Sequence, residues 1–288
     1  MRRALKSLAV FSLRQTLRYR RLRHLGRWLN VAANGDGLGD DWNSNGERMV
    51  FENIISSAAH GAILEVGAHD GSHTVAMIEA MRRARSCVHT IHSFEPSAAN
   101  AARWIDTTAN AGADDCVVLN RAACSDSSGE AILRCRAGGG RNGFHETYAG
   151  PEGDSTETVR TTTLDEYARA AGLSELLLLK IDTEGHDLQV LRGALELLQS
   201  KQIQYVQFEY NSAWIASRHF LKDAFDLLLP RGYFIGKIHK TFIERFIEWD
   251  YRLEWFEQTN FVAWIEHIDP LFPIEVTRGY LDHKSSSE

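Results

Sequence analysis

The sequence predicts an α/β protein built on a mostly parallel sheet. Apolar runs of strand length alternate with segments of helical spacing, and several of these runs end in an acidic residue. The clearest are residues 62–66, which lead into a glycine-containing turn, and residues 176–181, which form one continuous apolar run. Strands that alternate with helices favour a parallel sheet, whose carboxyl ends meet at one edge. We therefore expect the acids to gather at a single functional edge.

The composition is that of one large globular domain with appendages. The chain has 288 residues, of which 44% are hydrophobic and 24% are charged. Its formal net charge of −6 argues against a general nucleic-acid binder. The four cysteines show neither a C-x-x-C pair nor metal-ligand spacing, which favours reduced thiols in a cytosolic protein. We divide the chain into a basic arm and linker (1–45), a domain (46–268) and a C-terminal tail (269–288).

The first 30 residues differ from the rest of the chain. They contain nine Lys or Arg residues and no acid. An acid-free basic start is compatible with a helix on a membrane surface, with a transit peptide and with a solvated basic helix. No apolar run reaches the roughly 18 to 20 residues that span a bilayer. We expect a cytoplasmic protein and leave peripheral membrane contact through this arm open.

The first predicted strand leads into the turn EVGAHDG at residues 65–71. Gly67 and Gly71 permit a sharp turn and a close approach to a bound molecule. The helix that follows would point its free N–H groups at the turn. A dinucleotide fingerprint would require a glycine where His69 stands, which argues against a nucleotide-dependent oxidoreductase.

The second predicted strand, residues 89–94, ends at Glu95 and Pro96. Because proline disfavours the α conformation of the preceding residue, Glu95 is expected to be extended at the end of the strand. A carboxylate offers two acceptor oxygens, and a ribose diol offers two donors. We predict that Glu95 binds a ribose; the alternative is an acid at the start of the next helix.

The third predicted strand, residues 116–119, precedes Asp126. Two interpretations of Asp126 remain open: contact with an adenine amino group, and the first position of a turn over residues 126–129. Residues 130–136 resemble a hairpin strand. The following loop, up to about residue 154, is either a segment that closes over a substrate or variable surface.

The second strong element is the apolar run at residues 176–181, which ends in Asp182 and is followed by Glu184, His186 and Asp187. Acids are common at helix starts, which accounts for Glu184 and Asp187 but not for Asp182 at the end of an apolar strand.

The next predicted strand, residues 203–208, ends in Glu209. Capping boxes at residues 44–47 and 163–166 predict helix starts. We expect a further helix at residues 220–229. The last two strands are predicted at residues 232–238 and 260–265, with an aromatic-rich insertion between them at residues 242–256.

Six motifs occur in the order found in FkbM-type methyltransferases, which this chain resembles over about residues 60–238. They lie at residues 65–71, 94–96, 125–126, 163–165, 179–187 and 208–211. The resemblance implies a Rossmann-like methyltransferase fold, with a mostly parallel seven-stranded sheet and helices on both faces. It also implies S-adenosylmethionine as methyl donor and a hydroxyl acceptor on a sugar, glycolipid or polyketide-like small molecule. Two residues depart from the family pattern: Glu65 replaces Asp, and His69 replaces Asn.

The hypothesis assigns the charged residues to two groups. The donor-binding residues are Glu65, Gly67, His69, Asp70, Gly71, Glu95, Asp126 and Asp182. The catalytic and acceptor-contacting residues are Asp182, Glu184, His186 and Glu209. His186 is favoured as general base because an unperturbed imidazole titrates near neutral pH. Alternatively, Asp182, Glu184 and Glu209 bind a divalent cation that lowers the pKa of the acceptor hydroxyl.

A rival from another class is a non-catalytic binding protein that retains the methyltransferase fold and docks through its basic arm. It predicts donor binding without turnover, or no donor binding.

Overall fold

The computed structural model describes residues 24–26, 29, 41–57, 60–84, 88–113, 116–136, 142–145 and 154–277. Most of the predicted basic arm and linker therefore lies outside the described residues. Within these segments, no helix has the length and apolar character needed to cross a membrane.

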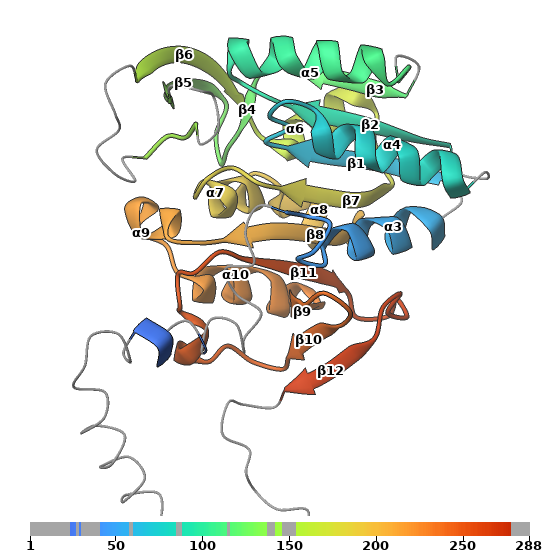
Figure 1. Cartoon of the computed structure of the whole chain (residues 1–288), viewed down its shortest axis with the longest axis vertical. Helices are drawn as coiled ribbons and strands as arrows, with labels where there is room; N and C mark the ends of the chain where they lie inside the picture. Colours follow the sequence, from blue (N-terminus) through green and yellow to red (C-terminus); the bar gives the residue numbers. More distant parts are fainter. Residues whose placement is uncertain are drawn as a thin grey trace, which may run out of the picture.

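The main sheet has nine strands in the order β12-β10-β9-β11-β8-β7-β1-β2-β3 (Figure 1). They are β1 (His60–Val66), β2 (Val88–Phe94), β3 (Val117–Asn120), β7 (Leu176–Ile181), β8 (Ile203–Tyr210), β9 (Tyr233–Ile238), β10 (Ile243–Phe246), β11 (Thr259–Ile265) and β12 (Ile274–Thr277). The five neighbouring strands β8, β7, β1, β2 and β3 are mutually parallel. β11 pairs antiparallel with both β8 and β9. The mostly parallel sheet is confirmed, with two more strands than the seven expected.

Helices cover both faces of the sheet, as expected. They are α3 (Glu47–Ser57), α4 (Ser72–Ala84), α5 (Ala98–Asn110), α6 (Leu164–Ala171), α7 (Asp187–Arg192), α8 (Leu195–Gln199), α9 (Ala213–Ser217) and α10 (Leu221–Leu228), with short 3-10 turns at Leu229–Arg231 and Tyr251–Leu253. Successive strand residues face opposite sides, so Ile63 belongs to the buried cluster that includes residues of α3 and α4, while Leu64 belongs to the cluster that includes residues of α6 to α10. The two buried clusters form the core.

A second, three-stranded sheet stands beside the carboxyl end of the main sheet (Figure 1). It consists of β4 (Ala123–Cys124), β5 (Gly129–Cys135) and β6 (Ser155–Thr162). The hairpin strand predicted at residues 130–136 is β5, which pairs antiparallel with β6. Strand β6 was not predicted, because its polar sequence STETVRTT lacks an apolar run.

Local signals located α6 accurately, while the edge of the main sheet differs from the prediction. Thr163 accepts a hydrogen bond from the backbone N–H of Glu166 (3.1 Å), and Gly172 ends α6 in the left-handed conformation. By contrast, β10 lies inside the predicted aromatic-rich insertion, and β12 lies inside the segment 269–288 assigned to the tail. Because β12 pairs with β10, the predicted boundary at residue 268 separates a strand from its sheet.

Candidate functional site

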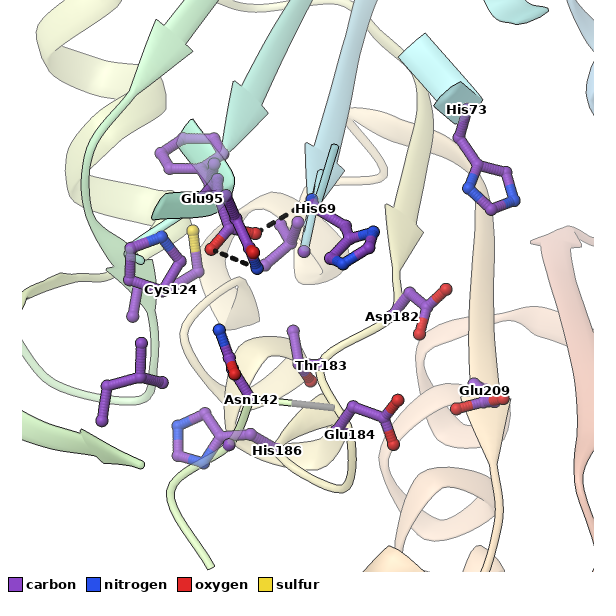
Figure 2. Close-up of a pocket in the computed structure, with 18 of the residues that line it drawn as sticks. His69, His73, Glu95, Cys124, Asn142, Asp182, Thr183, Glu184, His186 and Glu209 are labelled. Atoms are coloured by element: carbon purple, nitrogen blue, oxygen red, sulfur yellow. Dashed lines mark hydrogen bonds between the residues drawn. The ribbon is translucent and has the colours of Figure 1, made fainter. Parts of the chain in front are cut away.

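The carboxyl ends of β1 and β7 bound a cavity of about 400 Å³ (Figure 2). The chain leaves β1 toward β2 on one side of the sheet and returns through β7 on the other, which is the arrangement that opens a crevice in α/β sheets. Eight of the predicted site residues line this cavity: Gly67, His69, Asp70, Glu95, Asp182, Glu184, His186 and Glu209. The prediction that strand-end acids meet at one edge is therefore confirmed. Three predicted residues, Glu65, Gly71 and Asp126, do not line the cavity.

Gly67 is required for contact between two strand ends. Its φ is +87°, and a Cβ atom built there would lie 1.9 Å from the carbonyl oxygen of Asp182. Gly67 also lines the cavity, so the close contact with the chain adds a second reason for glycine here, and ligand contact stays a prediction. His69 also has a left-handed φ of +50°. Asparagine, the family residue at this position, adopts that region more readily than most residues.

Glu95 has both carboxylate oxygens anchored by the chain. The backbone N–H of His69 donates to Oε2 at 2.9 Å, and that of Ser97 donates to Oε1 at 2.9 Å. Burial raises the pKa of Glu95 above its ordinary value. A carboxylate accepts about four hydrogen bonds, so the anchored group keeps acceptor capacity for a ligand in the cavity.

Glu65 lies beneath the turn and not at the cavity surface. The hydroxyls of Thr74 and Ser93 each donate to its Oε2 at 2.6 Å, which ties together β1, β2 and α4. Its exposed fraction is 1%, and burial raises its pKa. The expected direct contact of Glu65 with a donor is not supported by this position. Gly71 likewise contacts the chain, because a Cβ there would lie 3.1 Å from Cδ1 of Trp104.

Asp182 stands at the end of β7 next to a buried lysine. The Lys180 ammonium donates to Oδ2 of Asp182 at 3.2 Å and lies 4.0 Å from Oε2 of Glu47. Burial opposes ionisation of Asp182, but the charge of Lys180 outweighs it and holds the Asp182 pKa below its ordinary value. Asp182 therefore presents an ionised carboxylate to the cavity.

Glu47 is a site residue that the sequence did not single out. The sequence placed it in a capping box with Ser44, but the Glu47 N–H donates to Oδ1 of Asn45 (3.0 Å), and the Ser44 hydroxyl donates to the Asp41 carbonyl (3.1 Å). Its carboxylate, however, is buried in the cavity wall, where the amides of Gln207 and Asn260 donate to it at 2.8 and 2.9 Å. These partners lie more than 150 residues away, so no local signal could have revealed the position of Glu47.

Glu209 completes the acidic end of the cavity. The side-chain amide of Asn211 donates to its Oε2 at 2.6 Å, and that of Gln258 donates to its Oε1 at 2.8 Å. Burial, reinforced by the nearby charges of Asp182 and Glu184, raises the Glu209 pKa well above its ordinary value. Glu209 is therefore the stronger proton acceptor of the two strand-end carboxylates, Asp182 and Glu209.

His186 does not have the properties on which its prediction as general base rested. Burial lowers its pKa to about 4, so the imidazole is neutral and weakly basic at pH 7. Its Nε2 lies 2.9 Å from the Ser125 hydroxyl, and Nδ1 is buried without a hydrogen-bond partner. In Figure 2, His186 lies on the same side of the cavity as Cys124 and Asn142, while Asp182 and Glu209 lie on the other.

Asp126 is exposed beside the cavity. Its Oδ1 accepts from the hydroxyls of Ser125 (3.4 Å) and Ser127 (3.2 Å), and the side chain does not line the cavity wall. This placement favours the turn interpretation over direct contact with adenine. Cys124 lines the cavity instead, and burial raises the pKa of its thiol. The three cysteines within the described segments are free thiols.

The loop after β5 reaches the cavity, as one of its two interpretations requires. Asn142, Gly143 and Phe144 line the wall, and the backbone groups of Gly143 and Arg134 exchange hydrogen bonds of 3.0 and 3.1 Å. The Phe144 ring centre is 4.7 Å from that of His186. Sequence patterns did not mark these residues individually, nor the lining residues Ser72, His73, Asn100, Leu133, Thr183 and Gln258.

The alternative of a metal site at Asp182, Glu184 and Glu209 finds no support in their placement. Among the described residues, no group of three or more His, Cys, Asp or Glu side chains is arranged to hold a metal ion. Asp182 instead accepts from the ammonium of Lys180, and Glu209 accepts from the side-chain amides of Asn211 and Gln258.

Comparison with known proteins gives one family. The family model described as "Methyltransferase FkbM domain" matches residues 65–235. A search of curated proteins gives no match. Among solved structures, an FkbM methyltransferase from Methylobacillus flagellatus KT is similar at 13% identity and a TM-score of 0.47, covering 72% of this chain and 44% of that one.

Two other solved methyltransferases are similar at lower scores. A precorrin-6y C5,15-methyltransferase from Geobacter metallireducens GS-15 has 12% identity and a TM-score of 0.41, with coverage of 76% and 87%. A SAM-dependent methyltransferase from Agrobacterium tumefaciens has 8% identity and a TM-score of 0.44, with coverage of 76% and 61%. The match with the Methylobacillus flagellatus FkbM methyltransferase covers 44% of that protein, so this chain spans less than half of its length.

Proposed function

Because the chain belongs to the FkbM methyltransferase family, we propose that it transfers a methyl group from S-adenosylmethionine to a hydroxyl of a small molecule or glycan. The observation that carries the proposal is the single cavity that joins Glu95 and the β1 turn to the acids of β7 and β8. A sugar, glycolipid or polyketide-like compound is the acceptor class that we propose.

The residues fit the donor. S-adenosylmethionine supplies an activated methyl group on a positively charged sulfonium. Neither Lys nor Arg is among the described residues that line the cavity, whereas six carboxylates are: Glu47, Asp70, Glu95, Asp182, Glu184 and Glu209. This charge balance suits a cationic ligand. Glu95 is the residue that we expect to bind the ribose hydroxyls, because its carboxylate is held in place and retains acceptor capacity.

The acidic end fits a hydroxyl acceptor. Methyl transfer to oxygen requires alignment of the two reactants and removal of the hydroxyl proton. Asp182 and Glu47 offer carboxylate oxygens to the hydroxyls of an acceptor. The ammonium of Lys180 forms ion pairs with both carboxylates. We assign the role of general base to Glu209, whose raised pKa gives it the higher proton affinity.

The proposal is tested by calorimetric titration with S-adenosylmethionine and, separately, with NAD. We expect binding of the former alone. Glu95→Gln should weaken that binding by about 10- to 100-fold, the range for lost hydrogen bonds to a charged group. Glu130→Gln, the same change at an exposed position of β5, should leave binding unchanged.

Methyl transfer from labelled S-adenosylmethionine to a panel of hydroxylated acceptors then tests turnover. Tight donor binding with no transfer to any acceptor would favour the non-catalytic alternative. Binding of NAD in place of S-adenosylmethionine would contradict the proposal.

A further inference from the structure

We propose that His186 recognises the amino group of the donor's adenine through Nδ1, as a binding residue and not as a base. This inference rests on the proposed function, since it concerns the same donor. Its starting point is a buried polar atom at the cavity without a partner: Nδ1 of His186, on a side chain of which only 8% is exposed. An unsatisfied buried polar atom is costly, so its presence requires an explanation.

The position of His186 supports this assignment. Glu95 and the acids at Asp182 and Glu209 mark two ends of the cavity, and His186 lies with Cys124 and Asn142, away from Glu209 (Figure 2). If Glu95 binds the ribose and the reacting methyl group points to the acids, the base of the nucleoside must extend the other way.

The wall at that end suits a flat aromatic ring. The cavity lining includes the apolar or small side chains Phe94, Ala122, Ala123, Cys124, Leu133 and Phe144, of which Cys124 lies on the His186 side (Figure 2). The Phe144 ring, 4.7 Å from that of His186, adds an aromatic surface of the kind that favours ring contacts.

Hydrogen bonds around His186 indicate which ring nitrogen accepts. The Ser125 hydroxyl has two neighbours, His186 Nε2 at 2.9 Å and the Asp126 carboxylate at 3.4 Å. The Ser125 hydroxyl donates to Oδ1 of Asp126, which leaves its oxygen to accept from Nε2–H. In a neutral imidazole the other nitrogen, Nδ1, is then an acceptor with a free lone pair. An exocyclic amino group is the matching donor.

The backbone fixes Ser125 for this role. Its N–H donates to the Thr162 carbonyl at 2.9 Å. Its own carbonyl approaches Gly193 so closely that a Cβ there would lie 2.0 Å away. Asp126 thus acts on the ligand indirectly, through Ser125 and His186, which explains why an acid outside the cavity wall occupies this motif.

The first test needs no mutation. Calorimetry compares S-adenosylhomocysteine with S-inosylhomocysteine, in which a carbonyl replaces the amino group. We expect the wild-type protein to bind the deaminated ligand about tenfold more weakly, the loss typical of one hydrogen bond left unmade in a buried site. Equal affinities would overturn the inference. If neither ligand nor S-adenosylmethionine binds, the proposed function itself fails.

Two substitutions then distinguish the ring nitrogens. His186→Asn places its amide oxygen near the position of Nδ1, while His186→Gln places its amide near Nε2 and offers nothing at Nδ1. We expect His186→Asn to bind S-adenosylhomocysteine within about threefold of wild type. His186→Gln should bind it about tenfold more weakly, and this variant should bind the deaminated ligand equally well. Thermal unfolding verifies that both variants are folded.

Glu130→Gln, at an exposed position of β5, is the control, and it should keep wild-type affinity for both ligands. The inference is overturned if both His186 variants keep wild-type ligand affinity but lose methyl transfer at saturating donor. That result would favour His186 as general base.

Discussion

Replacing Lys180 by methionine should strongly destabilise the protein. The Lys180 side chain is 4% exposed, and its ammonium lies 3.2 Å from Asp182 and 4.0 Å from Glu47. Methionine keeps much of the length and the apolar stem of lysine but removes the charge. Two carboxylates at the cavity wall would then lose their lysine partner. The other ion-pair contact of Glu47, with Nε2 of His73 at 3.9 Å, does not replace it, because burial lowers the His73 pKa to about 3 and leaves the imidazole neutral.

The size of the stability loss follows from the burial of the ion pairs that Lys180 forms. Removal of one partner from a buried ion pair costs about 3–5 kcal/mol, because the remaining charge stays desolvated. Since two carboxylates depend on Lys180, we expect the upper part of that range, about 4–5 kcal/mol. Lys201→Met is the matched control: Lys201 lies 3.7 Å from Glu266, but the two side chains are 32% and 50% exposed. Such a surface pair contributes about 0–1 kcal/mol.

The loss of folding free energy in Lys180→Met should be larger at neutral pH than at acidic pH. In the wild type the folded-state pKa of Asp182 is lowered, so this residue stabilises the fold above its ordinary pKa, and the contribution is lost as the pH falls through the folded value. Without Lys180, burial raises that pKa, and the variant gains stability when Asp182 is protonated. The difference between wild type and variant is therefore largest at pH 7 and shrinks toward pH 4.

Urea denaturation of the wild type and the two variants at pH 7 and pH 5 measures these differences. The reasoning is refuted if Lys180→Met loses no more than Lys201→Met at pH 7. It is also refuted if its deficit grows on acidification.

Three further predictions concern the site and its supports. Gly67→Ala should unfold the β1 turn or abolish donor binding, because its Cβ would lie 1.9 Å from the Asp182 carbonyl oxygen at a φ of +87°; a soluble variant with wild-type affinity in calorimetry would contradict this contact. Thr163→Ala should cost about 1 kcal/mol in urea denaturation, since it removes the cap that accepts from the Glu166 N–H, whereas Thr163→Ser should cost little. Glu209→Gln should slow methyl transfer by about 10²- to 10⁴-fold with unchanged donor affinity; the wild-type rate should rise with pH through a value above the usual range of a glutamate, and a flat profile would argue against Glu209 as base.

The sequence by itself determined the framework of the site. β7 is an apolar run, β2 is followed by a proline, and β8 is rich in apolar and aromatic residues, and these local patterns place Glu95, Asp182 and Glu209 at or beside the carboxyl ends of their strands. Parallel strands share a direction, so their ends meet at one edge regardless of how far apart they are in the sequence. The caps of α6 were equally readable, because the hydrogen bonds that form them join neighbouring residues.

Strands without an apolar run were not visible in the sequence. β6, β10 and β12 are polar or short, and each exists because a partner strand supplies its hydrogen bonds. Their formation depends on tertiary context more than on local propensity.

Only the tertiary structure decided the chemical state of the site residues. Glu47 belongs to the cavity because the amides of Gln207 and Asn260 surround it, although the sequence shows it as an ordinary helix-start acid. Burial lowers the pKa of His186 to about 4, because it removes the water that would stabilise the charged imidazole. Desolvation and charge pairing depend on which distant segments pack together, and a pattern of neighbouring residues carries no record of them.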